Sequence, residues 1–215
     1  MNLALFDFDG TITFKDSFAP FIKLSVNASM PITARIRALP VIAGYKMGIV
    51  SASRTRSKIS ALVFRGRPES EIRELGSNYA RGTLPGTIRP KAEKRIAWHK
   101  AQADTVVVVS AALDMYLAEW CRLASLDVIC TELEVVDGVL TGRYRGGDCV
   151  GPEKLRRIKE RYRLEDFAEI YAYGDTIEDS AMLSLANRRY FRWRELAGDV
   201  PQARRADHVD QNPDR

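Results

Sequence analysis

The sequence predicts an α/β fold built on a doubly wound parallel sheet, and three features of its 215 residues support this prediction. Short apolar runs alternate with helical patterns along the chain, which is typical of parallel strands joined by helices. Val106–Val109 is a continuous β-branched run, as expected of a central strand covered on both faces. Roughly a hundred residues separate the first two apolar runs, so we expect an inserted module, because one crossover needs far fewer.

Five apolar runs are the predicted strands. Ligands of doubly wound sheets bind outside the carboxyl ends of the strands. Three of these runs end at residues that carry reactive groups, so we expect those residues to converge although they lie far apart in the sequence. The predicted strands are Leu3–Phe8, Thr105–Ser110, Leu126–Cys130, Ile170–Tyr173 and Tyr190–Trp193.

The inserted module is predicted to be a helical cap over residues 14–90, which leaves residues 1–13 and 91–215 as the core domain. The segment from Glu69 to Tyr79 is amphipathic, and prolines divide the insertion into helix-sized pieces. Earlier in the insertion, four residues follow helical spacing: Phe18, Phe21, Ile22 and Ser25.

Two further segments have recognisable patterns. Residues 132–144 predict a β-hairpin, because Asp137 and Gly138 separate two alternating runs. The residues from Glu195 onward are polar, and we expect them to be loosely held.

The amino-acid composition limits the kinds of partner that we expect the protein to bind. The chain carries 33 Lys and Arg against 28 Asp and Glu, a net charge of +5 that favours anionic partners. We find no Cys/His finger, aromatic RNA-binding motif or basic heptad, so we expect no nucleic-acid partner. Three cysteines without a C-x-x-C pair and two distant histidines argue against a zinc site or a disulfide framework. With no signal peptide pattern at its start, the chain is expected to be cytoplasmic.

The apolar stretch Ala38–Val50 is too short to span a bilayer, and we expect it to pack inside the cap. The alternative is a helix on a membrane surface, since basic residues flank it, which would make the protein peripheral to a membrane. Further basic residues follow in the cap, either as a solvated face or as an attractor for a polyanionic substrate. They are Arg54, Arg56, Lys58, Arg65 and Arg67.

The most informative residues are Asp7 and Asp9, which end the first run. Side chains at positions i and i+2 of an extended segment point to the same side, and Gly10 lets backbone amides approach a ligand. Two charges about 4 Å apart repel by roughly 4 kcal/mol at an effective dielectric of about 20. The pair therefore indicates a bound cation or a shared proton, although an Asp-rich turn is an alternative reading.

Other polar residues occupy similar places further along the chain. Asp175 follows the fourth run, with Asp179 about one helical turn later, Ser110 follows the β-branched run, and Lys154 lies at the start of a helix. Each has an ordinary structural alternative. Ser110 can cap a helix, Lys154 can be solvated, and Asp179 can be a first-turn acid favoured by the helix dipole.

Four short motifs resemble, in type and in order, the four motifs of the haloacid dehalogenase (HAD) superfamily. They are Asp7-Phe-Asp9-Gly-Thr, Ser110, Lys154, and Gly174-Asp175 with Asp179. The insertion is similar to the cap of its subfamily IB, the phosphoserine-phosphatase-like branch. Ala111, Ala112 and Gly10 differ from phosphoserine-specific members. The Gly-x-Glu-Lys motif and Arg192–Arg194 look more like bacterial relatives of the phosphatidylglycerophosphatase C type.

The resemblance implies a mechanism. Asp7 would be the nucleophile that forms an aspartyl-phosphate, and Asp9 the general acid and base. Mg²⁺ would be held by the Asp7 carboxylate, the Asp9 backbone carbonyl and Asp175.

The same resemblance assigns the remaining site residues. Ser110, Lys154 and the backbone around Gly10 would bind the phosphate. Asp179 would orient the metal shell or Lys154.

The expected function is therefore that of a Mg²⁺-dependent phosphomonoester hydrolase. A phosphoryl transferase or mutase, an Asp-phosphorylated receiver domain and an inactive binding module are the alternatives. The substrate is either a small phosphoserine-like metabolite or a lipid phosphate such as phosphatidylglycerophosphate.

Overall fold

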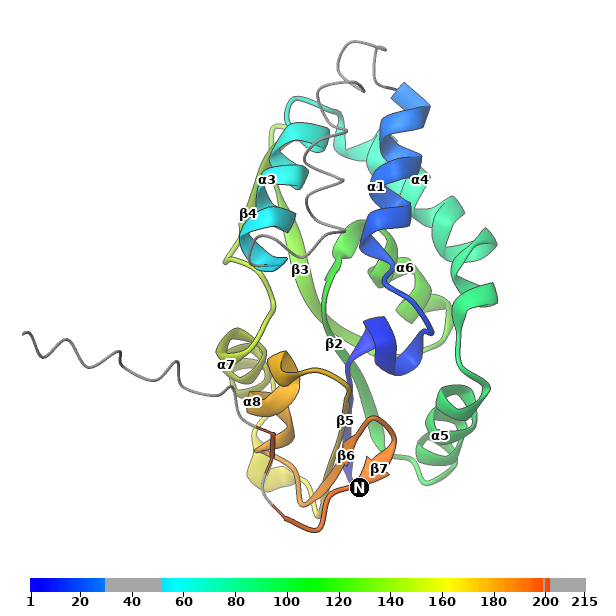
Figure 1. The fold of residues 1–215 in the computed structure, drawn as a ribbon, viewed down its shortest axis with the longest axis vertical. Coiled ribbons are helices and arrows are strands. Elements are labelled where there is room, and N and C mark those ends of the chain that lie inside the picture. Colours follow the sequence, from blue (N-terminus) through cyan, green and yellow to red (C-terminus); the bar gives the residue numbers. More distant parts are fainter. Residues whose placement is uncertain (30–51, 199, 202–215) are drawn as a thin grey trace, which may run out of the picture.

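The computed structural model describes residues 1–29, 52–198 and 200–201 (Figure 1). A seven-stranded sheet runs through the molecule in the order β4-β3-β2-β1-β5-β6-β7. Neighbouring strands from β3 to β6 are parallel, whereas β4 and β7 add antiparallel edges. The predicted α/β fold with a mostly parallel sheet is confirmed. The strands are β1 (Leu3–Phe6), β2 (Thr105–Leu113), β3 (Asp127–Val136), β4 (Val139–Arg145), β5 (Ile170–Gly174), β6 (Arg188–Phe191) and β7 (Arg194–Glu195).

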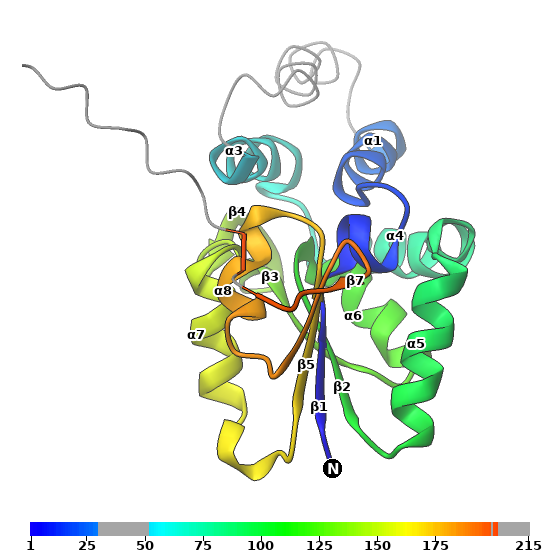
Figure 2. The same cartoon turned by 60° about the horizontal axis from the view of Figure 1, so that its bottom comes forward.

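Helices cover both faces of the sheet (Figure 2). Successive residues of β1 point to opposite faces, which explains why all four are buried. Leu3 and Leu5 join the apolar cluster of α7 and α8, whereas Ala4 and Phe6 join the cluster of α5 and α6. The helices of these two layers are α5 (Pro90–Ala101) and α6 (Asp114–Leu123) on one face, and α7 (Pro152–Arg161) and α8 (Ser180–Leu183) on the other.

Three more helices stand beyond the carboxyl ends of the strands: α1 (Phe18–Ser29), α3 (Ala52–Phe64) and α4 (Glu69–Gly82) (Figure 2). The helical spacing predicted for the first of them is confirmed, because Phe18, Phe21, Ile22 and Ser25 are all buried. The stretch Ala38–Val50 lies outside the described residues. Among the helices that are described, none has the length and apolar character needed to cross a membrane.

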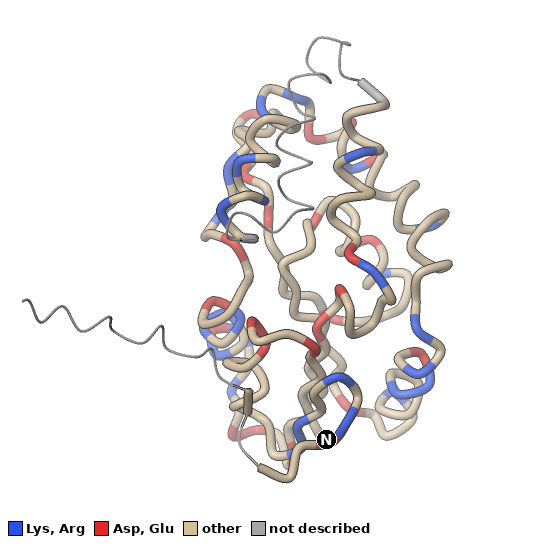
Figure 3. Tube along the Cα trace, in the orientation of Figure 1, with Lys and Arg blue, Asp and Glu red and all other residues tan. Residues whose placement is uncertain are grey.

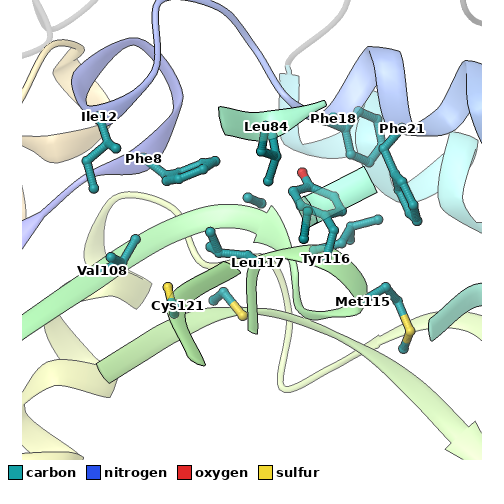
Figure 4. Packing of buried hydrophobic residues seen from close by; sticks show 14 of the residues in the cluster. Phe8, Ile12, Phe18, Phe21, Leu84, Val108, Met115, Tyr116, Leu117 and Cys121 are labelled. Carbon is teal, nitrogen blue, oxygen red and sulfur yellow. The ribbon is translucent and has the colours of Figure 1, made fainter. Parts of the chain in front are cut away.

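The apolar cluster of these helices continues into the sheet without a break. Phe18 and Phe21 of α1 lie beside Tyr116 of α6, and the same cluster reaches Val108 in the centre of the sheet (Figure 4). Phe21 and Tyr116 have ring centroids 4.8 Å apart. The helical module therefore shares one core with the sheet.

The hairpin predicted at Asp137 and Gly138 is confirmed. Both residues have positive φ, 49° and 76°, as a two-residue type I′ turn requires. Its first arm continues the strand predicted at residues 126–130, so the two predicted segments form a single strand, β3. The hairpin packs against α3, where the Ser60 and Tyr144 hydroxyls lie 2.9 Å apart.

Several strand ends differ from the prediction. β1 stops at Phe6 and not at Phe8, because residues Phe8–Ile12 form a short helical turn. β2 continues past Ser110 to Leu113, with a shift of register between these residues, so Ser110 lies at a bulge and not at the strand end. β6 runs from Arg188 to Phe191 and stops before Trp193, because residues 192–193 turn the chain into β7.

A fully buried histidine on α5 fixes one corner of the core. His99 Nδ1 lies 2.8 Å from Asp104 Oδ2, and Nε2 lies 2.9 Å from the Tyr173 hydroxyl. Burial lowers the pKa of His99 below its usual 6.5, although Asp104 acts in the opposite direction. The imidazole is therefore neutral in the folded protein at neutral pH.

This histidine predicts a pH-dependent stability. The unfolded chain takes up a proton at His99 more readily than the folded protein, so the free energy of unfolding should fall as the pH drops below about 6.5. In a His99→Gln variant this contribution disappears. Urea unfolding between about pH 8 and about pH 5 should show a steeper decline for the unsubstituted protein than for the variant. Parallel curves would contradict the assignment.

Candidate active site

Asp7 is the first residue after β1, with extended backbone angles. Its N–H donates to the Tyr173 carbonyl at 2.9 Å, which ties it to β5. Gly10 turns the chain away with φ +87°, and a Cβ at Gly10 would lie 2.3 Å from Asp175 Oδ2. Only glycine combines this backbone angle with so close an approach.

Three carboxylates meet at this end of the sheet. Asp7, Asp175 and Asp179 each offer an oxygen, and these oxygens lie within 4.8 Å of one another. The cause is topological, because β1 and β5 are adjacent and parallel and Asp175 follows directly after β5. Clustered carboxylate oxygens suit a hard divalent cation such as Mg²⁺. Figure 3 shows acidic segments gathering where these strands end, while basic segments follow α3, α5 and α7.

Lys154 joins two of the three carboxylates. Its ammonium lies 2.6 Å from Asp7 Oδ1 and 2.6 Å from Asp179 Oδ1. Burial alone would lower the pKa of Lys154, but the two carboxylates outweigh it and raise the pKa above its usual value. The alternative of a solvated lysine is therefore wrong.

Asp179 is held from its other side. Its Oδ2 accepts hydrogen bonds from the N–H groups of Asp175 at 3.1 Å and Thr176 at 3.0 Å, and from the Thr176 hydroxyl at 3.1 Å. Burial acts against ionisation, but the neighbouring Lys154 and these donors lower the pKa of Asp179 below its usual value. Asp179 thus stays ionised and fixes the direction of Lys154.

Asp9 has a different environment from Asp7. Its Oδ1 accepts the Ser17 N–H at 2.8 Å, and Ser17 in turn contacts the hydroxyls of Tyr116 and Tyr79 at 2.9 and 3.0 Å. Burial, with Asp16 as the second cause, raises the pKa of Asp9 to about 7. The Asp9 carboxyl can therefore hold a proton near neutral pH. It is not one of the three clustered carboxylates.

Most of the candidate residues line one cavity of about 130 Å³, and Asp175 and Gly10 are the two that do not. Ser110 is buried in its wall, and the Ser110 hydroxyl accepts the Ala112 N–H at 3.1 Å. The Asp175 side chain accepts a hydrogen bond from the Thr11 hydroxyl at 3.0 Å. The lining residues are Asp7, Asp9, Asp16, Arg56, Ser110, Ala111, Lys154, Thr176, Glu178 and Asp179.

Sequence reasoning missed Asp16, Thr176 and Glu178 and did not single out Arg56. Arg56 extends from α3 into the wall and forms an ion pair with Asp148 at 2.9 Å. The only signal for Arg56 was its place in a basic run, and Asp16 had none beyond its closeness to the first motif.

Comparison with known proteins identifies the class. Residues 4–184 match the family of haloacid dehalogenase-like hydrolases, and the chain belongs to this family. It is 30% identical over 196 residues to Protein CicA of Caulobacter vibrioides. The matched region covers 88% of this chain and 85% of CicA.

Solved structures show the same fold. A protein of unknown function from Bordetella pertussis Tohama I has a TM-score of 0.74 and 25% identity, covering 88% of this chain and 89% of its own. A phosphoserine phosphatase bearing a phospho-aspartyl intermediate analogue has a TM-score of 0.60 and 19% identity, covering 88% of this chain and 85% of its own.

Removing the ammonium of Lys154 should destabilise the metal-free protein. Lys154→Met leaves two buried carboxylates without a cation, so the free energy of unfolding should fall by about 3–5 kcal/mol. Added Mg²⁺ should restore part of this loss by binding the same carboxylates. Urea unfolding with chelator and with Mg²⁺ measures both effects.

Lys159→Met is the matched control, because Lys159 is exposed on the same helix. Equal losses in the two variants would show that the buried ion pairs contribute nothing specific.

Proposed function

We propose that the protein is a Mg²⁺-dependent phosphomonoester hydrolase that acts through an aspartyl-phosphate on Asp7. One observation carries the proposal. In a member of a hydrolase family, Asp7, Asp175 and Asp179 converge with Lys154 where β1 and β5 end. Such a site can offset the charge of a phosphate while presenting a carboxylate nucleophile.

Asp7 and Asp9 have different roles in the proposed reaction. An Asp7 oxygen attacks phosphorus as the ester P–O bond breaks, and Asp9 donates its proton to the departing alkoxide. Asp9 then takes a proton from a water molecule, which attacks phosphorus and releases inorganic phosphate and free Asp7. The separate environment of Asp9, with a pKa of about 7, supports this acid and base role.

The remaining residues bind the metal ion and the phosphate oxygens in the proposed mechanism. The carboxylates of Asp7 and Asp175 and the Asp9 backbone carbonyl would hold Mg²⁺, which supplies positive charge to the phosphate oxygens. Lys154, Ser110 and N–H groups around Gly10 bind those oxygens directly. The solved structure of a phosphoserine phosphatase with a similar fold contains a phospho-aspartyl intermediate analogue. This supports the same type of mechanism for the present protein.

We propose that residues 14–90 act as the cap over a core of residues 1–13 and 91–215. The position of α1, α3 and α4 beyond the strand ends supports this division, as does the start of α5 at Pro90. The cap contributes Asp16 and Arg56 to the cavity wall.

The cavity favours a small, polar phosphomonoester as substrate. Its lining carries both signs of charge, from Arg56 and Lys154 as well as Asp16 and Glu178, and its volume is about 130 Å³. A lipid phosphate, with peripheral membrane contact through the cap, is the alternative that substrate tests must include. The free and buried cysteines Cys121, Cys130 and Cys149 support a cytoplasmic location.

Phosphate release tests the function directly. The panel contains small phosphomonoesters and detergent-dispersed lipid phosphates, each with Mg²⁺ and with chelator. We expect Mg²⁺-dependent release that Asp7→Asn reduces by about 10⁴-fold or more. Asp166→Asn is the matched control, since Asp166 is exposed at the opposite end of the sheet. Full activity in Asp7→Asn would remove the nucleophile assignment.

Asp9→Asn separates hydrolysis from the receiver alternative. With an activated aryl phosphate, this variant should release about one equivalent of the leaving group rapidly and then turn over roughly 10²–10⁴-fold more slowly. Rapid-quench measurement of phosphorylated protein follows the intermediate. An unchanged steady-state rate on an alkyl phosphate would contradict the acid and base role. A phosphorylated Asp7 that persists for minutes in the unsubstituted protein would favour a receiver.

A further inference from the structure

The turn between β6 and β7 has an unusual backbone for its residues. Phe191 pairs with Arg194, so Arg192 and Trp193 form a two-residue loop. Both have positive φ, 49° and 64°. Bulky residues rarely adopt this conformation, which glycine and asparagine favour.

The chain makes a turn of the same kind elsewhere with favoured residues. The loop between β3 and β4 has positive φ at both positions and uses Asp137 and Gly138. At the second turn, an Arg-Trp pair keeps the strained conformation, and strain of this kind often accompanies a functional role. The side chains of Arg192 and Trp193 are therefore the features to explain.

Arg192 bonds to the loop that carries Asp175. Its backbone N–H donates to the Gly174 carbonyl at 2.8 Å. Its side-chain Nε donates to the Asp175 carbonyl at 3.1 Å. The two bonds hold the backbone carbonyls on both sides of Asp175.

Trp193 bonds to the loop that follows Asp7. Its indole Nε1 donates to the Thr11 carbonyl at 3.2 Å. The indole also packs against other side chains, since its centroid lies 5.6 Å from that of Tyr173 and 5.7 Å from the Lys91 ammonium. The donor is therefore aimed by packing and not by the hydrogen bond alone.

Thr11 closes the arrangement into a ring. Its hydroxyl donates to Asp175 Oδ1 at 3.0 Å, while its carbonyl accepts the indole of Trp193. The ring runs from Arg192 to Asp175, from Asp175 to Thr11, and from Thr11 to Trp193. It joins the loop after β1 to the loop after β5, whose carboxylates Asp7 and Asp175 lie in one cluster.

We propose that Arg192 and Trp193 are positioning residues that set the separation of the Asp7 and Asp175 loops and thereby the affinity of the site for Mg²⁺. The inference rests on the proposed function, because it assigns the clustered carboxylates to that cation. Neither residue lines the cavity, so both act through the backbone carbonyls that they hold. The strained turn is what brings an arginine and an indole donor to adjacent loops at once.

Two substitutions test the ring with Mg²⁺ alone as the probe. Trp193→Phe keeps an aromatic ring against Tyr173 but removes the N–H donor to Thr11. Arg192→Gln removes the donor to Asp175 from an exposed side chain. Arg194→Gln, at an exposed arginine two residues further on, is the matched control for Arg192→Gln.

Titration calorimetry on the metal-free full chain gives the Mg²⁺ dissociation constant without substrate. We expect it to rise about tenfold in Trp193→Phe and Arg192→Gln and to stay unchanged in Arg194→Gln. Phosphate release at saturating Mg²⁺ should keep its kcat, because the reacting groups are intact. The melting temperature in chelator shows whether each variant is folded.

Unchanged Mg²⁺ dissociation constants in both folded variants, with normal binding and phosphate release by the unsubstituted protein, would overturn the positioning role alone. A melting temperature that falls in chelator without a change in Mg²⁺ affinity would also overturn it, since the turn would then be merely structural. Absence of Mg²⁺ binding and of phosphate release in the unsubstituted protein would overturn the proposed function together with this inference.

Discussion

The site depends on the two ion pairs of Lys154. Burying Asp7 and Asp179 close together would oppose folding, and the ammonium between them supplies the compensating charge. Its placement requires α7 to begin at Pro152, directly after the positive-φ residue Gly151. Asp7, Lys154 and Asp179 come from three separate parts of the chain, so the arrangement exists only once these parts have packed together.

Asp7 and Asp9 show how one strand end produces two environments. Both line the same cavity, although β1 ends at Phe6 and Asp9 lies in the helical turn Phe8–Ile12. Gly10 then reverses the chain, and the Asp9 side chain meets Ser17 at the base of α1. Asp7 therefore belongs to the sheet and its carboxylate cluster, whereas Asp9 belongs to the junction with the helical module. This difference in partners matches the proposed division of roles, with Asp7 as nucleophile and Asp9 as acid and base.

The sequence was sufficient for the parallel strands, the hairpin and most of the clustered polar residues, because each has a local pattern, but not for the exact strand ends. Asp7, Lys154, Asp175 and Asp179 all lie together as this pattern predicts. The bulge at Ser110 was not predictable, since register depends on the partner strand. The contribution of Arg56 was not predictable either, because it depends on how α3 packs against the hairpin, which no local periodicity records.

That packing has a mechanical consequence. Gly142 of β4 lies against the backbone of α3, where a Cβ would be 2.8 Å from Ala61 Cα, and Ser60 meets Tyr144 on the same strand. The hairpin is itself the continuation of β3, a strand of the sheet. Because both contacts lie on β4, α3 and its Arg56 are fixed relative to the sheet, and Arg56 also pairs with Asp148 in the loop after β4. The position of Arg56 in the cavity wall is therefore set by the sheet as well as by the helical module.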